Sequence, residues 1–286
     1  MYQLGDMTLH LINDGITMAD PGGPFGLVPR VLYRRYFEPN ADFLIPMTLH
    51  NLLVESGGQR ILIDTGLGDK LTEKDIQRWG LQRPQGTLTD ALARLNLTPD
   101  DIDIVIDTHL HGDHCAGNTI ITAEGVVPAF PNAQYVTQRR EYEDAIRPNE
   151  RTAATYHSVN WDVLMQNGQM RLLDGDTVIA PGITGVVTPG HTPGHMSVKL
   201  ESDGQHALFV CDMASYAVHF ERLAWMTAYD VEPLVTLETK RRWQAWALEH
   251  DALLIFPHDP QRPAGRLRQD ASSGKMALET VAMPYA

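Results

Sequence analysis

The chain has 286 residues, and its 36 acidic residues outnumber its 23 lysines and arginines, giving a formal net charge of −13. So acidic a surface repels phosphate backbones, and no apolar run approaches the roughly 20 residues of a membrane span, so nucleic-acid and membrane partners are disfavoured. Two cysteines, Cys115 and Cys211, cannot build a disulfide framework. Residues 1–14 lack the basic and apolar regions of a signal peptide, so we expect a cytoplasmic globular protein.

The first distinctive segment, residues 14–43, is rich in glycine, proline and aromatic residues. Its composition predicts a long ordered loop, and loops of this length are more often functional than decorative. The apolar side chains of this loop suit either of two roles. The loop is a lid over an acyl or aryl group of a substrate, or it is a contact with a second subunit in a homodimer.

Helices and strands alternate along the rest of the chain. Two β-rich runs at 49–55 and 60–64 flank a turn and predict a hairpin. Apolar residues at helical spacing over 88–95 predict an amphipathic helix, and alternation over 102–107 predicts a strand. Further elements are predicted at 141–147 (helix), 183–188 (strand), 196–200 with 207–211 (hairpin), 232–250 (helix) and 252–256 (strand). The alternation favours an α/β fold, and no linker divides the chain.

The segment with the clearest chemistry follows the strand at 102–107 and reads Thr-His-Leu-His-Gly-Asp-His. Three histidines and one aspartate fall within residues 109–114. Imidazole and carboxylate groups together suit Zn, Mn or Fe, and so many ligand-type residues rarely cluster by accident. We expect Gly112 to let the backbone curl so that both flanks face one point.

Three later residues of ligand type, His191, Asp212 and His258, each follow an apolar strand. Loops at the strand ends of an α/β fold gather into a site at one edge, so these residues are expected to join the first cluster. Seven ligands suffice for two metal ions. The predicted set is His109, His111, Asp113, His114, His191, Asp212 and His258.

Together with the upstream segment 62–66, which contains Asp64, these motifs resemble the metallo-β-lactamase superfamily over about residues 48–260. The resemblance implies that residues 1–286 form one α/β domain, an αββα sandwich of two mixed β-sheets flanked by helices. It also implies two divalent metal ions, Zn first, with Mn, Fe or Co compatible with the same ligands. One ion would bind His109, His111 and His191, the other Asp113, His114 and His258, with Asp212 bridging them. Asp64 and His195 would orient the ligands.

Within the superfamily, the chain most resembles the N-acyl-homoserine lactonases and the methyl parathion hydrolase-like enzymes. The resemblance implies hydrolysis of a lactone or ester, with aryl esters and phosphotriesters as related substrates, by a hydroxide that bridges the metals. Asp113 would relay a proton to the leaving group. Tyr216 would donate a hydrogen bond to the oxyanion, although packing is an equal expectation for it. Phe25, Tyr216 and His219 would contact the substrate.

Two other functions stay open at this point. A thioesterase of the glyoxalase II type has the same ligand order, but it would need a basic region near the C-terminus, where the basic residues are scattered. The other function is that of a non-catalytic, metal-loaded binder of a small molecule. Such a protein need not keep every ligand, so the complete ligand set argues against this function. Cys115 and Cys211 adjoin predicted ligands, and we expect them to support the site rather than bind metal, because neighbours on an extended backbone point to opposite sides.

Overall fold

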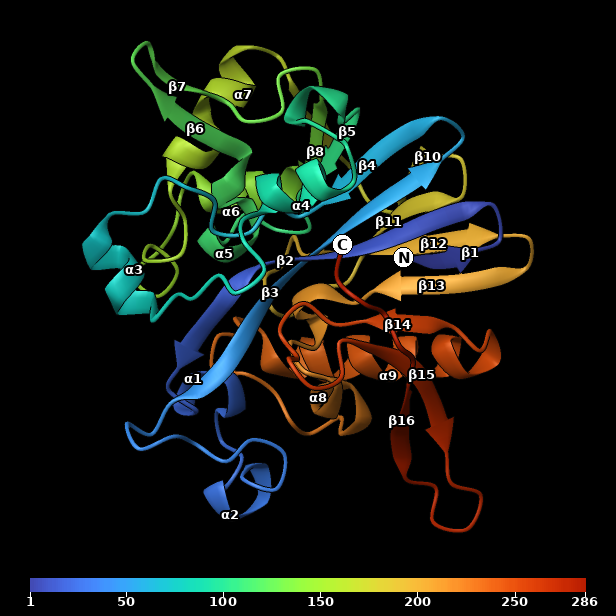
Figure 1. Ribbon diagram of the computed structural model, residues 1–286. Helices are drawn as coiled ribbons and strands as arrows, with labels where there is room; N and C mark the ends of the chain where they lie inside the picture. The colour runs from blue at the N-terminus through green and yellow to red at the C-terminus, as the bar shows by residue number, and fades with distance from the viewer.

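Two seven-stranded β-sheets pack face to face in the computed structural model, which describes residues 1–286 (Figure 1). The first sheet has the order β1-β2-β3-β4-β5-β8-β9, and it is antiparallel from β1 to β4 and parallel from β4 to β9. Its strands are β1 (Tyr2–Leu4), β2 (Met7–Ala19), β3 (Ile45–Ser56), β4 (Gln59–Ile63), β5 (Ile104–Ile106), β8 (Gln134–Gln138) and β9 (Met170–Leu173).

The second sheet follows chain order from β10 to β16 and is antiparallel except between β13 and β14. Its strands are β10 (Thr177–Ala180), β11 (Ile183–Val187), β12 (Met196–Ser202), β13 (Gln205–Phe209), β14 (Leu253–Ile255), β15 (Ala264–Gln269) and β16 (Met276–Thr280). A separate two-stranded ribbon consists of β6 (Thr119–Thr122) and β7 (Gly125–Pro128).

Helices cover the outer faces of both sheets. The helices of the chain are α1 (Gly22–Phe25), α2 (Arg30–Tyr33), α3 (Glu73–Trp79), α4 (Leu88–Arg94), α5 (Gly112–Cys115), α6 (Arg139–Ala145), α7 (Asp162–Gln166), α8 (Ala217–Glu221) and α9 (Pro233–Glu249). Short 3-10 turns occur at η1 (Pro99–Asp101), η2 (Ala116–Asn118), η3 (Ser158–Asn160) and η4 (Cys211–Met213). None of these helices combines the length and the hydropathy needed to cross a bilayer.

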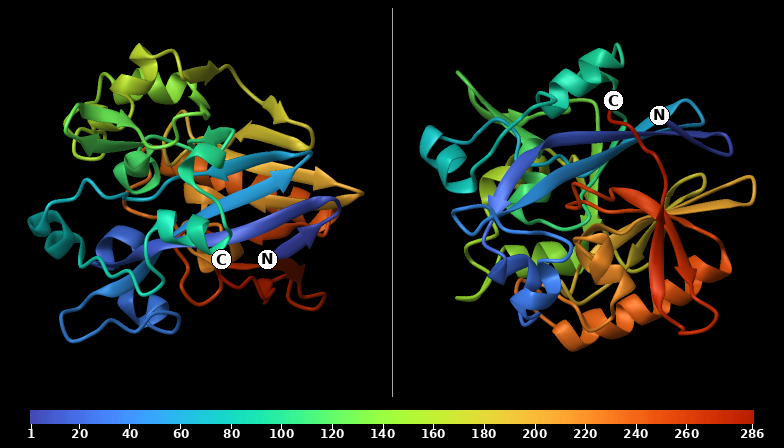
Figure 2. Two further views of the ribbon diagram at one scale, coloured as in Figure 1. Left: turned by 45° about the horizontal axis from the view of Figure 1, so that its top comes forward. Right: turned by 60° about the horizontal axis from the view of Figure 1, so that its bottom comes forward.

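The layers follow from side-chain alternation along buried strands. Successive side chains of a strand point to opposite faces of the sheet. In β3, Leu52 and Val54 pack against the second sheet, whereas Leu53 packs with residues of α4, α6 and α7. In β14, Leu253 likewise faces the first sheet, and Leu254 packs under α8 and α9. The resulting αββα sandwich confirms the predicted fold class (Figure 2).

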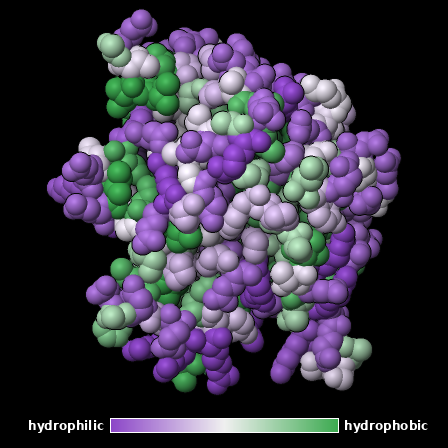
Figure 3. Space-filling model, in the orientation of Figure 1, coloured by the Kyte–Doolittle hydropathy of each residue, from purple (hydrophilic) through white to green (hydrophobic).

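The structure corrects the prediction for residues 14–43, which do not form one long loop. β2 continues through this region as far as Ala19 and pairs with β3, with an irregular register between Asn13 and Ile16. This irregularity interrupts the alternation that marks a strand in sequence, which explains the error. The short helices α1 and α2 follow. Leu27 and Val31 are exposed there, and Figure 3 shows small hydrophobic areas within a mainly hydrophilic surface. That residues 14–43 act as a lid over the substrate, or as a contact with a second subunit, stays a prediction.

A buried histidine of β3 joins the first sheet to the second and to the C-terminal tail. The Nδ1 atom of His50 lies 2.8 Å from the carbonyl oxygen of Phe256, and its Nε2 atom lies 2.8 Å from the hydroxyl of Tyr285. Burial lowers the pKa of His50 from 6.5 to about 4, so the imidazole is neutral in the folded protein. Because the unfolded chain binds this proton near pH 6.5, His50 makes folding stability fall as the pH drops from about 6.5 to about 4.

This linkage predicts that His50→Gln flattens the pH dependence of stability. Between pH 7 and pH 5, the free energy of unfolding of the wild type should fall by about 2 kcal/mol more than that of the variant. Urea unfolding of both proteins in excess chelator measures the difference without interference from metal binding. Equal losses in the two proteins would show that His50 does not titrate with a lowered pKa.

Candidate metal centre

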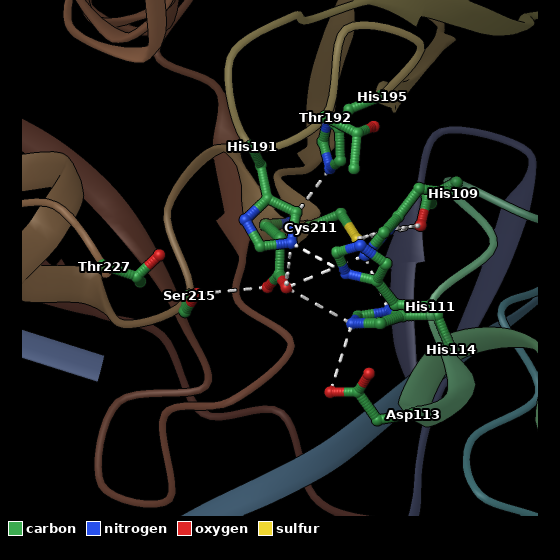
Figure 4. Close-up of polar contacts among 12 residues, drawn as sticks. His109, His111, Asp113, His114, His191, Thr192, His195, Cys211, Ser215 and Thr227 are labelled. Carbon is green, nitrogen blue, oxygen red and sulfur yellow. Dashed lines mark hydrogen bonds and ion pairs between the residues drawn. The ribbon is translucent and has the colours of Figure 1, made fainter. Parts of the chain in front are cut away.

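All seven predicted ligands come together at one edge of the sandwich, where loops that follow strands of both sheets meet. His109 and His111 follow β5, and His191 follows β11. One ligand atom from each of these three residues lies within 4.8 Å of the other two, and Nε2 of His191 is 3.1 Å from Nδ1 of His111. Figure 4 shows these imidazoles turned toward one another. We call these three residues the first ligand group.

A second ligand group lies beside the first. It consists of Asp113 and His114 on α5 and His258 after β14, and its ligand atoms also lie within 4.8 Å of one another. Oδ2 of Asp113 is 3.7 Å from Nε2 of His114 and 3.8 Å from Nε2 of His258. Gly112 is the first residue of α5 and has an ordinary helical conformation. The two neighbouring ligands are therefore positioned by a helical turn. The backbone conformations that only glycine adopts easily, which we expected to be needed here, are not used.

The carboxylate of Asp212, on the turn η4 after β13, lies between the two groups. Its Oδ2 atom is 3.2 Å from Nε2 of His191 in the first group and 3.4 Å from Nε2 of His114 in the second. Its Oδ1 atom is 3.1 Å from Nε2 of His258. One carboxylate therefore faces both groups, as expected of a bridging ligand.

The chemistry of these atoms fits divalent metal ions. The Nε2 atoms of His109, His114 and His258 are buried and have no hydrogen-bond partner in the protein. An unsatisfied buried polar atom costs about 1–3 kcal/mol, so three of them in one cluster call for a ligand. Neutral imidazoles with carboxylates form the donor set of zinc and similar ions.

The electrostatics of the cluster differ from one ligand to the next. Burial and the neighbouring imidazoles lower the pKa of His109 and that of His111 well below the usual range, which leaves their lone pairs free. Burial opposes ionisation of Asp212, but the imidazoles of His258 and His191 hold the pKa of its carboxyl well below its usual range. Burial opposes protonation of His114 and His191 as well, but nearby carboxylates raise the pKa of His114 well above its usual range and raise that of His191, so a metal ion would displace a proton from these two imidazoles.

Hydrogen-bond acceptors fix the orientation of the ligand histidines from behind. A partner on the second ring nitrogen selects the tautomer and aims the ligand atom at the metal. The Nδ1 contacts are His114 to Asp64 (2.9 Å), His191 to Asp230 (3.0 Å) and His258 to the carbonyl oxygen of Thr48 (2.6 Å). Asp64 thus lies where an orienting residue was predicted, whereas Asp230 and Thr48 were not predicted. Asp230 follows no strand and belongs to no sequence motif, so nothing in the sequence indicated its role.

His195 and Cys211 both contact the cluster from outside. Nε2 of His195 accepts a hydrogen bond from the backbone N–H of Asp212 at 3.1 Å, so His195 positions that carboxylate. The Cys211 thiol lies 3.6 Å from Nδ1 of His114 and 3.9 Å from Nδ1 of His109, the nitrogens opposite those that face Asp212. Its place behind the rings agrees with a supporting role. The thiol of Cys115 is also free and buried.

The backbone is left-handed at two residues that are not glycine and that adjoin His114. Asp64 has a φ of 57° and Cys211 has a φ of 49°. Such conformations cost about 1–3 kcal/mol each and persist where the surrounding structure enforces them, commonly at functional sites. Gly190 has a φ of 136°, and a Cβ atom there would meet Thr236 at 2.3 Å, so the turn before His191 requires glycine.

A cavity of about 310 Å³ opens onto both ligand groups. Ligands from both groups and Asp212 form its polar floor, and its walls include Pro24, Met47, Trp79, Arg151, Tyr216 and Tyr229. A second, mostly apolar cavity of about 680 Å³ shares Met47, Trp79 and Tyr229 with the first. The site therefore combines a polar floor with an apolar extension large enough for a hydrocarbon chain.

The three residues predicted to contact substrate lie differently from one another. Tyr216 borders the first cavity, but its hydroxyl donates a hydrogen bond to the carbonyl oxygen of Pro46 at 3.1 Å, and its role as a donor to substrate stays a prediction. Phe25 and His219 do not reach the cavity wall, contrary to our prediction. Both are fully buried, because the Phe25 ring packs between Tyr33 and Tyr216 and against His219.

Comparison with known proteins agrees with this geometry. Residues 50–232 match the model of the metallo-beta-lactamase superfamily. The chain is 28% identical over 236 residues to the N-acyl homoserine lactonase AttM of Rhizobium radiobacter, a match that covers 77% of this chain and 84% of that protein. It is 26% identical over 234 residues to an N-acyl homoserine lactonase of a Bacillus species, covering 78% and 85%.

Solved structures extend the likeness to nearly the whole chain. A protein described as a probable metal-dependent hydrolase from Staphylococcus aureus superposes with a TM-score of 0.87 at 30% identity, covering 98% of this chain and 100% of that one. The dizinc quorum-quenching lactonase AidC has the same fold, with a TM-score of 0.77 at 20% identity, covering 98% and 97%. The chain therefore belongs to the metallo-β-lactamase superfamily. It is a hydrolase of that family, which uses divalent metal ions.

The orphaned imidazole nitrogens predict that metal stabilises the fold. Adding Zn²⁺ to chelator-treated protein should raise its unfolding temperature, because a ligand at a hundredfold its Kd contributes about 2.7 kcal/mol per site. Asp212→Asn should lose most of this shift, since a neutral amide is a poor bridge. The exposed Asp251→Asn, remote from the cluster, serves as the control. An unchanged unfolding temperature with Zn²⁺, Mn²⁺ and Co²⁺ alike would argue against a metal centre.

Proposed function

We propose that this chain is a dinuclear metallohydrolase that opens the lactone ring of N-acyl homoserine lactones or cleaves related carboxylic esters. The observation that carries the proposal is the Asp212 carboxylate, which lies between two three-residue ligand groups on the floor of the cavity. The lactonase relatives at 26–28% identity support the choice of substrate class.

The two ligand groups would each hold one divalent ion, and Asp212 would contact both. Zn²⁺ is the proposed metal, and Mn²⁺, Fe²⁺ and Co²⁺ suit the same nitrogen and oxygen donors. When bound, such a pair of ions lowers the pKa of a coordinated water toward about 7 and polarises the carbonyl of the substrate. The side chains of the site would position the substrate and the water, and they would transfer the proton.

Asp113 is the residue proposed to move the proton. Its carboxylate lines the cavity and is 16% exposed, the most accessible of the carboxylates in the cluster. From this place it can accept the proton of the attacking water and return it to the leaving alcohol oxygen when the acyl C–O bond breaks. Asp212 is more constrained, because the Ser215 hydroxyl donates to its Oδ1 atom at 3.1 Å and its backbone N–H is bound by His195.

The shape of the two cavities supports an acyl substrate. In the proposed binding mode the scissile bond would lie over the candidate ligands that line the first cavity, and the second cavity shares Met47, Trp79 and Tyr229 with the first. Each methylene group buried there contributes about 0.8 kcal/mol of binding free energy. We therefore propose that the substrate carries an apolar acyl chain, which lies in the second cavity while its lactone or ester group lies in the first.

The test combines metal analysis with a substrate panel on one purified sample. We expect two metal ions per chain, and hydrolysis of N-acyl homoserine lactones that chelator abolishes and Zn²⁺ restores. The decanoyl lactone should have a lower KM than the butanoyl lactone, because the apolar cavity accommodates the longer chain.

The rest of the panel separates the competing functions. An aryl ester and paraoxon test the ester and phosphotriester alternatives, and an S-acyl glutathione tests a thioesterase of the glyoxalase II type. Two bound metals without turnover of any substrate would favour a non-catalytic binder. Full lactonase activity in excess chelator, or after Asp212→Ala, would contradict the dinuclear proposal.

A further inference from the structure

Glu141, in the first turn of α6, is a completely buried carboxylate outside both ligand groups. Three hydrogen bonds from three separate segments converge on it. The backbone N–H of Leu110 donates to Oε1 at 3.0 Å, and the hydroxyl of Tyr156 donates to the same atom at 2.9 Å. The hydroxyl of Thr192 donates to Oε2. Both carboxylate oxygens therefore act as acceptors.

Each of these donors is adjacent to a member of the first ligand group. Leu110 lies between His109 and His111 in the chain, and Thr192 directly follows His191. The Tyr156 ring lies 5.2 Å from the His111 ring, and the two residues form a β-bridge. Glu141 thus ties together, from behind, every segment that carries a ligand of the first group.

The backbone of α6 also packs against the loop that carries His191. Gly194, in the turn after His191, packs so closely on Glu141 that a Cβ atom would come 2.2 Å from its backbone nitrogen. Neither this contact nor the three hydrogen bonds involves the second ligand group. That group is held by other atoms, the Asp64 carboxylate behind His114 and the Thr48 carbonyl oxygen behind His258.

We propose that Glu141 is a positioning residue that sets the metal affinity of the first ligand group independently of the second. The inference rests on the metal centre of the proposed function. Without the carboxylate, the three donors lose their common acceptor, and the loops that carry the first group must then be ordered by the metal itself. Loss of such an outer contact weakens metal binding by about tenfold to a hundredfold in characterised sites.

Glu141→Gln is the variant that tests the proposal. Glutamine keeps the shape of the side chain and one acceptor oxygen, but it removes the negative charge and replaces the charge-assisted bond from the Thr192 hydroxyl with a weaker neutral one. Titration with Zn²⁺ and Co²⁺ against a competing chelator measures both binding steps in the wild type and in the variant. We expect one step to weaken by about tenfold to a hundredfold and the other to stay unchanged.

A second variant, in which the other ligand group is incomplete, shows which of the two metal-binding steps Glu141→Gln weakens. In His258→Ala only the first ligand group is complete, so Glu141→Gln should weaken the remaining site by the same factor there. The Co²⁺ absorption spectrum of this single site should also change, because the geometry of its ligands changes. The matched control is Glu221→Gln, since the Glu221 side chain is only 7% exposed but accepts from Arg262 and the backbone of Leu278. It should leave both affinities unchanged.

The outcomes separate this inference from the proposed function. A wild type that binds fewer than two ions contradicts the dinuclear function itself. Two ions in the wild type, with unchanged or equally weakened steps in Glu141→Gln, overturn the role given to Glu141. If that variant does not fold, Tyr156→Phe removes one donor and keeps the ring. It should weaken the first site alone, by a smaller factor than Glu141→Gln would, and an unchanged affinity overturns the proposal.

Discussion

The structure depends on one electrostatic arrangement, the buried Asp212 carboxylate beside the imidazoles of His114, His191 and His258. The Nε2 atoms of His114 and His258 have no hydrogen-bond partner in the protein. Such a cluster is costly in a protein interior, because burial removes water from polar groups without replacing its hydrogen bonds. Divalent cations relieve this cost by accepting the lone pairs and balancing the carboxylates. The residues of the site therefore fit a metal centre, and several hydrogen bonds of the surrounding polar network hold the imidazoles in place.

The αββα architecture brings these ligands together from distant parts of the chain. Loops after β5, β11, β13 and β14 come from both sheets and meet at one edge, above a core that both sheets share. The two ligand groups have separate supports, with Asp230 and Glu141 behind the first and Asp64 behind the second. In the dinuclear centre that we propose, this separation would allow each metal position to be adjusted without disturbing the other.

The residues that form the two candidate ligand groups could be located from the sequence, whereas most of the residues that support them could not. His109, His111, Asp113 and His114 are close in the chain, and the other three ligands each follow an apolar strand, so local patterns locate all seven. Asp230 and Glu141 act through hydrogen bonds to residues between 15 and 51 positions away in the chain, which no local pattern encodes. The irregular register of β2 interrupts the alternation by which a strand is recognised in the sequence. The inward packing of Phe25 could not be predicted either, because it depends on contacts with residues far away in the chain.

The most direct test of the metal centre is a crystal structure of the Zn²⁺-loaded protein with anomalous diffraction recorded on both sides of the zinc absorption edge. Two anomalous peaks should flank the Asp212 carboxylate, one within the first ligand group and one within the second. A single peak, no peak, or zinc bound to the thiol of Cys211 in place of Asp212 would contradict the account.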